Sequence, residues 1–338
     1  MSLTRFLTKI LSLMLFQVLV LTCGLVLTCG VVSAQVFPSK PLKIIAGYPP
    51  GGGTDMQARL IAQKLSERWG QPVVVENLAG GLGTTSIRAV TRSAADGYTL
   101  YMGASDHLVF VASLYKNLPF DTLRDLIPVS PVADQPIVIV VRNAVAANSL
   151  SELIALAKQN PGTLSFASVG SGSISHLGGE LFQSLTGTKI LHIPYKGSAP
   201  AVSDLLSGQG ADLMFASFAT VAPHIKAGKL RALAIASERR WPTMPEVPTT
   251  TEAGSPLLKM HTWNGIFLPA GTPSNIVNFI NQALIDMLKE PEVVDRLTAM
   301  GFEPKGLRSE EFSALVVADL KKWQKIITDA GIPIQAFQ

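Results

Sequence analysis

The chain has 338 residues, of which 47% are hydrophobic and 15% charged, so it can bury sizeable cores and is not a disordered chain. Its length suits one large domain or two of medium size. Lysine and arginine number 28 against 24 aspartate and glutamate residues. So small an excess of positive charge argues against a nucleic-acid-binding protein.

The first 34 residues have the pattern of a secretory signal peptide. Arg5 and Lys9 precede a long apolar run that ends in Val-Ser-Ala, which predicts cleavage after Ala34 and export to the periplasm. An uncleaved anchor helix is the alternative, because the run is long for a signal peptide. Both cysteines, Cys23 and Cys29, lie in this segment, and each follows a threonine where a lipid-attachment motif prefers a small residue. The exported chain would carry no thiol, and its net charge would be +2, from 26 basic and 24 acidic residues.

Apolar runs alternate with amphipathic segments along the rest of the chain, and this alternation predicts an α/β fold with mostly parallel strands. Strands are expected at 43–48, 72–77, 98–103, 136–142, 163–168, 189–195, 211–217, 230–237 and 260–270. Helices are expected from about Asp55, after Ser149 or Ser151, over 173–187, from about Pro200, before the strand at 230, from Pro273 and from Ser309.

Two strands are longer than the others, at 136–142 and 260–270, and each can cross between two sheets. They divide the chain into a discontinuous lobe one (35–137 and 260–338) and a lobe two (138–259). Ligands of open α/β sheets bind beyond the carboxyl ends of the strands. A ligand is therefore expected between the lobes, with closure about the two connecting strands.

A glycine cluster, Gly51 to Gly53, separates the first strand from its helix, with Thr54 and Asp55 as candidate N-caps. Backbone N–H groups and the helix dipole at such a junction favour an anion. The alternative is a tight turn with no ligand. Neither a phosphate-binding P-loop nor a dinucleotide fingerprint fits the spacing, because no Gly-Lys-Ser/Thr follows and the last glycine is missing.

Similar loops recur at 79–86, 169–176 and 195–200, so small and hydroxyl-bearing residues follow strands in both lobes. Such loops can hold a small carboxylate from two sides through N–H and O–H donors. The residues that we expect to contact the ligand from lobe one are Tyr48, Pro50, Gly51, Gly52, Gly53, Thr54, Asp55, Gly81, Gly83, Thr84 and Ser105. Those expected from lobe two are Ser171, Ser173, His176, Tyr195, Lys196, Gly197 and Ser217.

Several long motifs appear in order: YPPGGGTDMQARLIAQKL, AGGLGTTSIRAV, HIPYKGSAPAVSDLLSGQGADLMF and WNGIFLPAGTP. Together they resemble the periplasmic substrate-binding receptors of tripartite tricarboxylate transporters, the Bug-type receptors. The resemblance implies a two-lobe Venus-flytrap (periplasmic-binding-protein) fold with two crossover strands and a small organic acid as ligand. It implies that Tyr48 and the Gly51–Thr54 loop grip a carboxylate and that Asp55 caps the helix beneath them.

The resemblance also implies a monomeric receptor that needs no cofactor, and inner-membrane permease subunits as its partners. Two positions depart from the family pattern: Ala216-Ser217 replaces an acid after the strand, and Asn264 replaces an aromatic residue. The loss of an acid disfavours an amine and favours a second carboxylate or an apolar ring. Citrate-like, dicarboxylate, amino-acid and aromatic ligands all stay open.

The five histidines show no metal-ligand spacing, and no nucleophile elbow is present, because Gly172 stands where the serine would be. His192 alternates with apolar residues, which predicts a core or edge strand residue whose ring nitrogens are hydrogen-bonded. The stretch Ser105-Asp106-His107-Leu108 places an acid and a histidine at a strand end. Two other classes of function remain: an enzyme using His176 or Asp106 as a base, and a sensor that presents its ligand to a signalling protein.

Overall fold

The computed structural model describes residues 37–237, 239–329 and 331–337. The expected signal peptide, residues 1–34, lies outside the described residues. Lys40–Gln338 form one compact unit, to which the following description belongs. Over the described ranges, no helix combines the length and the apolar character needed to cross a membrane.

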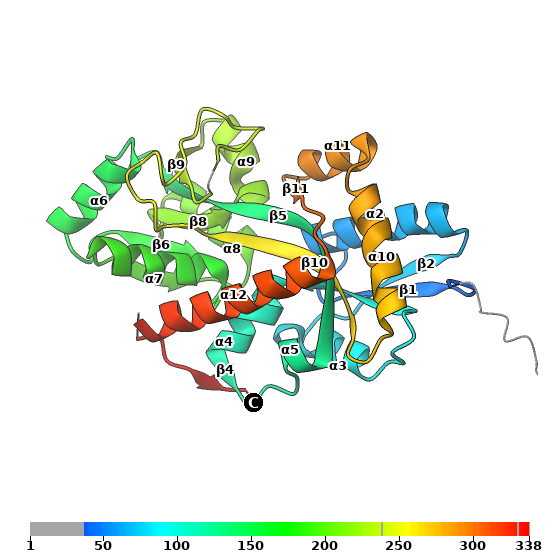
Figure 1. Ribbon diagram of the computed structural model, residues 1–338. Helices are drawn as coiled ribbons and strands as arrows, with labels where there is room; N and C mark the ends of the chain where they lie inside the picture. Colours follow the sequence, from blue (N-terminus) through cyan, green and yellow to red (C-terminus); the bar gives the residue numbers. More distant parts are fainter. Residues whose placement is uncertain (1–36, 238, 330, 338) are drawn as a thin grey trace, which may run out of the picture. The chain divides into compact units, whose positions relative to one another are not determined.

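Strands and helices alternate as the sequence predicts (Figure 1). The strands are β1 (Leu42–Ala46), β2 (Val73–Asn77), β3 (Thr99–Ala104), β4 (Tyr115–Lys116), β5 (Leu126–Arg142), β6 (Ser165–Ser168), β7 (Leu191–Pro194), β8 (Leu213–Ser217), β9 (Leu230–Ile235), β10 (His261–Pro269), β11 (Glu303–Pro304) and β12 (Gln335–Ala336). The helices are α2 (Gly53–Trp69), α3 (Thr84–Thr91), α4 (Ala112–Leu114), α5 (Thr122–Asp125), α6 (Leu150–Gln159), α7 (Ile174–Thr186), α8 (Ser198–Ser207), α9 (Phe218–Lys226), α10 (Ser274–Met287), α11 (Pro291–Ala299) and α12 (Ser309–Asp329).

The strands form two sheets with the same internal order. In the first sheet, β1 pairs in parallel with β2 and β3, β10 runs antiparallel to β3, and the first part of β5 follows. In the second sheet, β6 pairs in parallel with β7 and β8, and the last part of β5 runs antiparallel to both β8 and β9. Each sheet thus has three parallel strands, one reversed strand and a fifth strand. The short β11 also pairs with β5 in the first sheet, and β12 pairs with β4 apart from both.

β5 belongs to both sheets. Its residues 126–136 pair with β10, and residues 137–142 pair with β8 and β9. It starts earlier than the strand expected at 136–142, although Pro128 and Pro131 interrupt its sequence. Two register shifts against β10 lie beside these prolines. Proline has no N–H to donate to a neighbouring strand, and at a bulge no such hydrogen bond is required.

The second connection between the sheets lies where the sequence predicts it. β9 ends at Ile235, beside Val138, and β10 begins beside Pro136, so both strands line the same edge of β5. Just before β10, the Met260 N–H donates to the Ala236 carbonyl at 2.9 Å. Two segments therefore join the sheets, β5 and the chain that leads into β10.

Three local expectations were wrong: that the strand at 72–77 is buried, that two helices finish the chain, and that Ser309 caps the second of them. β2 is an exposed edge strand rather than a buried one, with Val74 58% exposed. A third C-terminal helix, α11, begins at Pro291 and buries Val293 and Leu297. Ser309 does not act as a side-chain cap of α12, because its Oγ donates to the Pro128 carbonyl at 2.6 Å and so ties the helix to β5.

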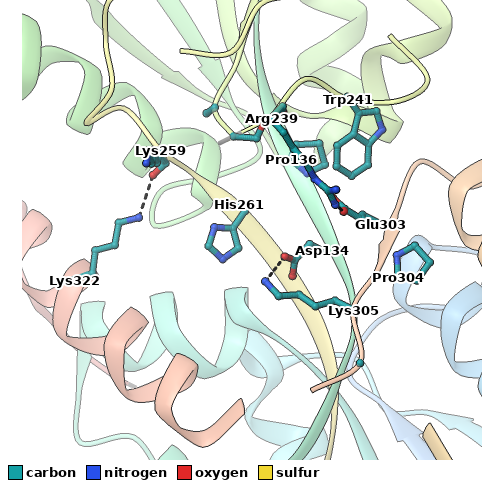
Figure 2. Close-up of a pocket in the computed structure, with 13 residues that line it drawn as sticks. Asp134, Pro136, Arg239, Trp241, Lys259, His261, Glu303, Pro304, Lys305 and Lys322 are labelled. Carbon is teal, nitrogen blue, oxygen red and sulfur yellow. Dashed lines mark hydrogen bonds and ion pairs between the residues drawn. The ribbon is translucent and has the colours of Figure 1, made fainter. Parts of the chain in front are cut away.

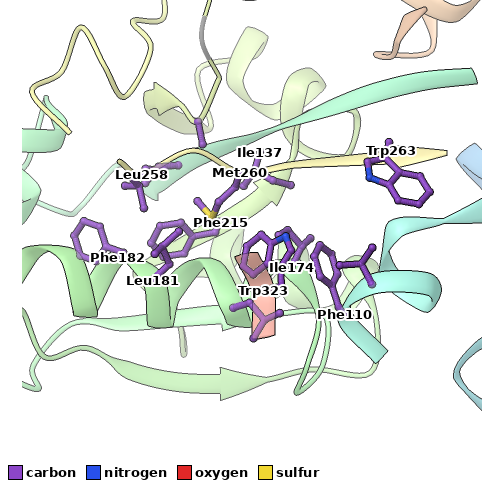
Figure 3. Close-up of a cluster of buried hydrophobic side chains, with 14 of the residues drawn as sticks. Phe110, Ile137, Ile174, Leu181, Phe182, Phe215, Leu258, Met260, Trp263 and Trp323 are labelled. Carbon is purple, nitrogen blue, oxygen red and sulfur yellow. The ribbon is translucent and has the colours of Figure 1, made fainter. Parts of the chain in front are cut away.

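One apolar cluster extends from the first sheet to the second (Figure 3). α12 supplies the expected buried stripe: Phe312, Val316, Leu320, Trp323 and Ile327. The Trp323 ring meets Phe110 edge to face at 4.9 Å, and Phe182 and Phe215 continue the cluster beside the second sheet. α12 therefore packs apolar side chains from both halves of the fold.

Candidate functional site

The loop before α2 begins the candidate site at the carboxyl end of β1. α2 starts at Gly53 with Gly52 as its N-cap, so Thr54 and Asp55 lie inside the first turn, and the expectation that either is the N-cap was wrong. Asp55 nevertheless holds the loop, since its carboxylate accepts from the Gly51 N–H at 2.9 Å. Burial raises the pKa of Asp55, but hydrogen bonds from Arg59, Gly51 and Asn77 outweigh it and lower the pKa below its ordinary value.

The N–H groups of Gly52, Gly53 and Thr54 donate to no acceptor in the described part of the chain. Pro50, Gly51 and Gly52 are exposed, while Gly53 packs so closely on Phe302 that an added Cβ would lie 2.7 Å from its ring. The Thr54 hydroxyl lies 3.5 Å from the Asn264 amide oxygen on β10. The helix N-terminus therefore presents uncommitted donors, as an anion site requires.

Tyr48 lies beside two residues that the sequence places at the end of β3. Its ring stacks on His107 with centroids 4.4 Å apart, and its hydroxyl donates to the Asp106 carboxylate at 3.3 Å. Asp106 and His107 begin a π-helical turn, Asp106–Val111, of a kind often found at functional sites. Both were noted at a strand end but left out of the predicted ligand contacts; their place at the same sheet edge as Tyr48 is the signal that could have included them.

Two buried polar atoms of this cluster have no hydrogen-bond partner among the described residues: His107 Nδ1 and Asp106 Oδ1. Burial raises the pKa of Tyr48 well above its ordinary value and raises that of Asp106 to about 6. Burial also lowers the pKa of His107 to about 4, so its imidazole is neutral at pH 7. A neutral donor beside uncommitted amides suits a bound carboxylate.

The second glycine loop closes over His107. Gly80, Gly81, Leu82 and Gly83 all have positive φ, an uncommon run that includes a leucine with its side chain 46% exposed. Gly83 lies so near His107 that an added Cβ would be 2.3 Å from its Cγ. Thr84 is buried and starts α3.

Ser105 is buried at the end of β3, where its Oγ accepts from the Trp263 N–H at 3.2 Å. This bond fixes β3 to β10 at the edge of the site. Tyr48, Gly83 and Ser105 are therefore gathered around the Asp106-His107 pair at one end of the first sheet.

The opposite shifts of Asp106 and His107 predict a pH effect on stability. A raised carboxyl pKa adds stability as the pH falls from about 6 toward 3.8, whereas a lowered histidine pKa removes stability as the pH falls from 6.5 to about 4. Asp106→Asn removes only the first contribution. We expect its melting temperature to fall more steeply than that of the wild type between pH 6.5 and 4.

The control is Asp295→Asn, at an exposed position on α11, whose pH profile should follow the wild type. Parallel profiles for all three proteins would contradict the assignment of the shifted pKa to Asp106.

The predicted contacts from lobe two lie at the ends of β6, β7 and β8. Ser173 caps α7, and its Oγ donates to the Gly170 carbonyl at 2.6 Å. His176 Nδ1 accepts from the Gly172 N–H at 3.1 Å, and its ring stacks on His192 at 4.1 Å. His192 Nε2 forms a hydrogen bond with the Ser168 hydroxyl at 2.7 Å, as expected for a histidine in a strand of this pattern.

The remaining lobe-two residues differ in their availability. The Tyr195 hydroxyl donates to Asp204 of α8 and is thus engaged inside its own lobe. Lys196 and Ser171 are exposed, while Gly197 and Ser217 are the N-caps of α8 and α9, neither with a side-chain cap bond. Over the described ranges, no hydrogen bond, ion pair or ring contact joins these residues to the Tyr48 cluster. The β6–α7 loop instead meets α4, where Gly172 faces Leu114.

A cavity of about 820 Å³ lies beside the point where β5 passes from one sheet to the other (Figure 2). None of the predicted ligand contacts lines it. Across the described residues, no group of three or more His, Cys, Asp or Glu side chains could hold a metal ion.

Residues 57–332 match the family described as the tripartite tricarboxylate transporter family receptor. The chain belongs to this family of periplasmic solute-binding receptors, as its motifs suggested, and it has the two-lobe α/β fold of its solved members.

Protein BugT of Bordetella pertussis is 39% identical over 306 residues, which cover 90% of this chain and 93% of that protein. The structure of R. palustris Rpa4515 with adipate has a TM-score of 0.78 and 33% identity, over 88% of this chain and 99% of that one. MatC from Rhodopseudomonas palustris with bound malate has a TM-score of 0.73 and 30% identity, over 86% of this chain and 100% of that one.

Proposed function

We propose that this protein is exported to the periplasm, closes its two lobes on a small organic dicarboxylate and delivers it to the permease of a tripartite transporter. The observation that carries the proposal is the set of uncommitted N–H groups at Gly52, Gly53 and Thr54, beside the neutral His107 and Tyr48. Relatives bind adipate and malate, which are both dicarboxylates. The family description supports the transporter as the partner.

Lobe one would comprise 35–137 and 260–338, and lobe two 138–259, because β5 changes its pairing partners after Pro136. Two connecting segments leave a hinge about which the lobes can close on a ligand. In the closed state, the glycine loops of lobe one would hold the first carboxylate.

The loops of lobe two favour a second carboxylate over an amine. The stretches 169–175, 195–199 and 216–219 contain no acid, and they precede or open three helices, α7, α8 and α9. Helix N-termini attract negative charge, and the exposed Lys196 adds a cation at one of them. An ammonium group would find no carboxylate in these loops to pair with.

Thermal-shift measurements on the exported chain test the proposal. A panel of adipate, malate, succinate and citrate is compared with aspartate and with neutral sugars at equal ionic strength. A ligand at 100 times its Kd stabilises the folded state by about 2.7 kcal/mol, which should raise the melting temperature of a chain of this length by roughly 4 °C. We expect such a rise for at least one dicarboxylate; a rise with sugars alone would rule the proposal out.

A further inference from the structure

Two successive residues, Gly301 and Phe302, touch the N-terminal turns of two helices, one from each proposed lobe. The Phe302 ring packs on Gly53, the first residue of α2, where an added Cβ would lie 2.7 Å from the ring. Gly301 packs on Ala219, the second residue of α9, and a Cβ added to Gly301 would lie 2.9 Å from the Ala219 Cβ. In Figure 1, α11 and β11, which flank these two residues, stand between α2 and α9.

The turn that contains Gly301 and Phe302 is fixed to the end of α11. The Phe302 N–H donates to the Leu297 carbonyl, and the Gly301 N–H donates to the Thr298 carbonyl, both at 2.9 Å. Gly301 has φ +84°, so the two bonds and the left-handed glycine form the Schellman motif that ends many helices. The position of the turn is therefore set by α11.

The chain that follows the turn is also held. β11 pairs antiparallel with β5, and Lys305 Nζ lies 2.5 Å from the Asp134 carboxylate on that strand. Glu303 forms an ion pair with Arg239, which lies beyond the end of β9. A turn held by a helix on one side and by a strand on the other acts as a rigid spacer.

We propose that Gly301 and Phe302 are positioning residues that set the spacing between the N-termini of α2 and α9, and with it the length of the dicarboxylate that the lobes hold. This inference rests on the proposed function, in which α2 binds one carboxylate and the helix N-termini of lobe two attract the other. Phe302 supports Gly53 from one side, and the missing side chain of Gly301 lets α9 approach. Neither residue touches the ligand in this arrangement.

The contact distances give the size of the expected effect. Carbon atoms in contact lie about 3.5–4.0 Å apart, so a methyl group on residue 301, at 2.9 Å from the Ala219 Cβ, would force α9 away by roughly 0.6–1.1 Å. One methylene group lengthens an extended chain by about 1.3 Å, the projection of a C–C bond of about 1.5 Å. Gly301→Ala should therefore shift the preferred ligand by about one methylene group.

Titration calorimetry with malonate, succinate, glutarate, adipate and pimelate tests the proposal. The wild type should prefer one length. Gly301→Ala should weaken binding of that acid about tenfold or more, through the loss of one hydrogen bond to a charged group, and should move the optimum to the next longer acid. Ala219→Val enlarges the same contact from α9 without a left-handed residue, and it should move the optimum in the same direction.

Gly254→Ala is the matched control for Gly301→Ala. Gly254 has φ +81°, and an added Cβ there meets nothing within 4 Å, so this variant carries the same backbone cost without the contact with α9. Its length preference should equal that of the wild type. The double variant Gly301→Ala/Ala219→Gly removes the overlapping methyl group of α9 and should restore most of the wild-type preference.

The outcomes separate this inference from the proposed function. A variant that only loses stability would bind all five acids more weakly by the same factor. An unchanged or uniformly weakened series for both Gly301→Ala and Ala219→Val would overturn the spacer and leave the proposed function intact. An equal shift of the optimum in Gly254→Ala would overturn it as well. Failure of the wild type to bind any of the five acids would defeat both the spacer and the proposed dicarboxylate ligand.

Discussion

Replacing Gly83 with alanine should abolish carboxylate binding at the site around Tyr48, Asp106 and His107. It should also lower the free energy of unfolding by about 2–5 kcal/mol. Part of the loss comes from the backbone, because φ is +86° and a left-handed conformation costs a residue with a Cβ about 1–2 kcal/mol. The rest comes from overlap, since the new Cβ would lie 2.3 Å from His107 Cγ and 2.4 Å from Nδ1. Overpacking of this kind costs about 1–3 kcal/mol.

His107 cannot give way cheaply, because it is buried and its ring stacks on Tyr48. Displacing it would also move the Tyr48 hydroxyl from Asp106. The substitution therefore disturbs the residues that we expect to face the ligand, and not the loop alone.

Gly51→Ala is the matched control for Gly83→Ala. Gly51 has φ +84°, almost the same backbone conformation, and an added Cβ there meets nothing within 4 Å. Urea unfolding of both variants separates the backbone cost from the contact with His107. Equal losses for the two variants would show that packing of Gly83 against His107 is not important.

Trp323→Ala should destabilise the protein by about 3–5 kcal/mol, the usual cost of deleting a large buried aromatic side chain. Trp323 is 2% exposed, lies edge to face on Phe110, and belongs to the cluster that joins both sheets. Its removal leaves a cavity between α12 and the π-helical turn that carries His107. Chemical unfolding followed by circular dichroism measures the change.

Trp69→Ala deletes the same side chain at a half-buried position, where the ring stacks on Phe279 at 5.6 Å. We expect the loss of stability to be less than half of that caused by Trp323→Ala, because Trp69 buries less apolar surface on folding than Trp323 does. If the two variants lost the same stability, the apolar cluster around Trp323 would not contribute more to the stability of the fold than a half-buried surface contact.

Local patterns in the sequence predicted most elements and the kind of loop that follows them. Alternation of apolar runs with amphipathic segments indicated the parallel strands, and the stripe from Phe312 to Ile327 predicted the buried face of α12. Glycines at strand ends predicted the loop before α2 with its exposed donors. These features depend on neighbours within a few residues, so periodicity and turn chemistry reveal them.

Other features arise from contacts between distant residues. The prolines of β5 hid its first part, because only pairing with β10 shows that bulges accommodate them. Sequence patterns could not show that the Tyr195 hydroxyl is engaged by Asp204 or that Ser105 holds β10. Hydroxyl-bearing residues look equally available in a sequence, and only the packing around them decides which partner they take.

The sequence by itself therefore determined the fold class and the family, and it predicted the loops where a ligand should bind. Only the tertiary structure brought His107 and Asp106 against Tyr48, and only it placed Trp241, His261 and Lys322, three residues far apart in the chain, around one cavity. The reason is physical: periodicity records which face of an element is buried, whereas the register of strands and the seating of helices decide which side chains meet.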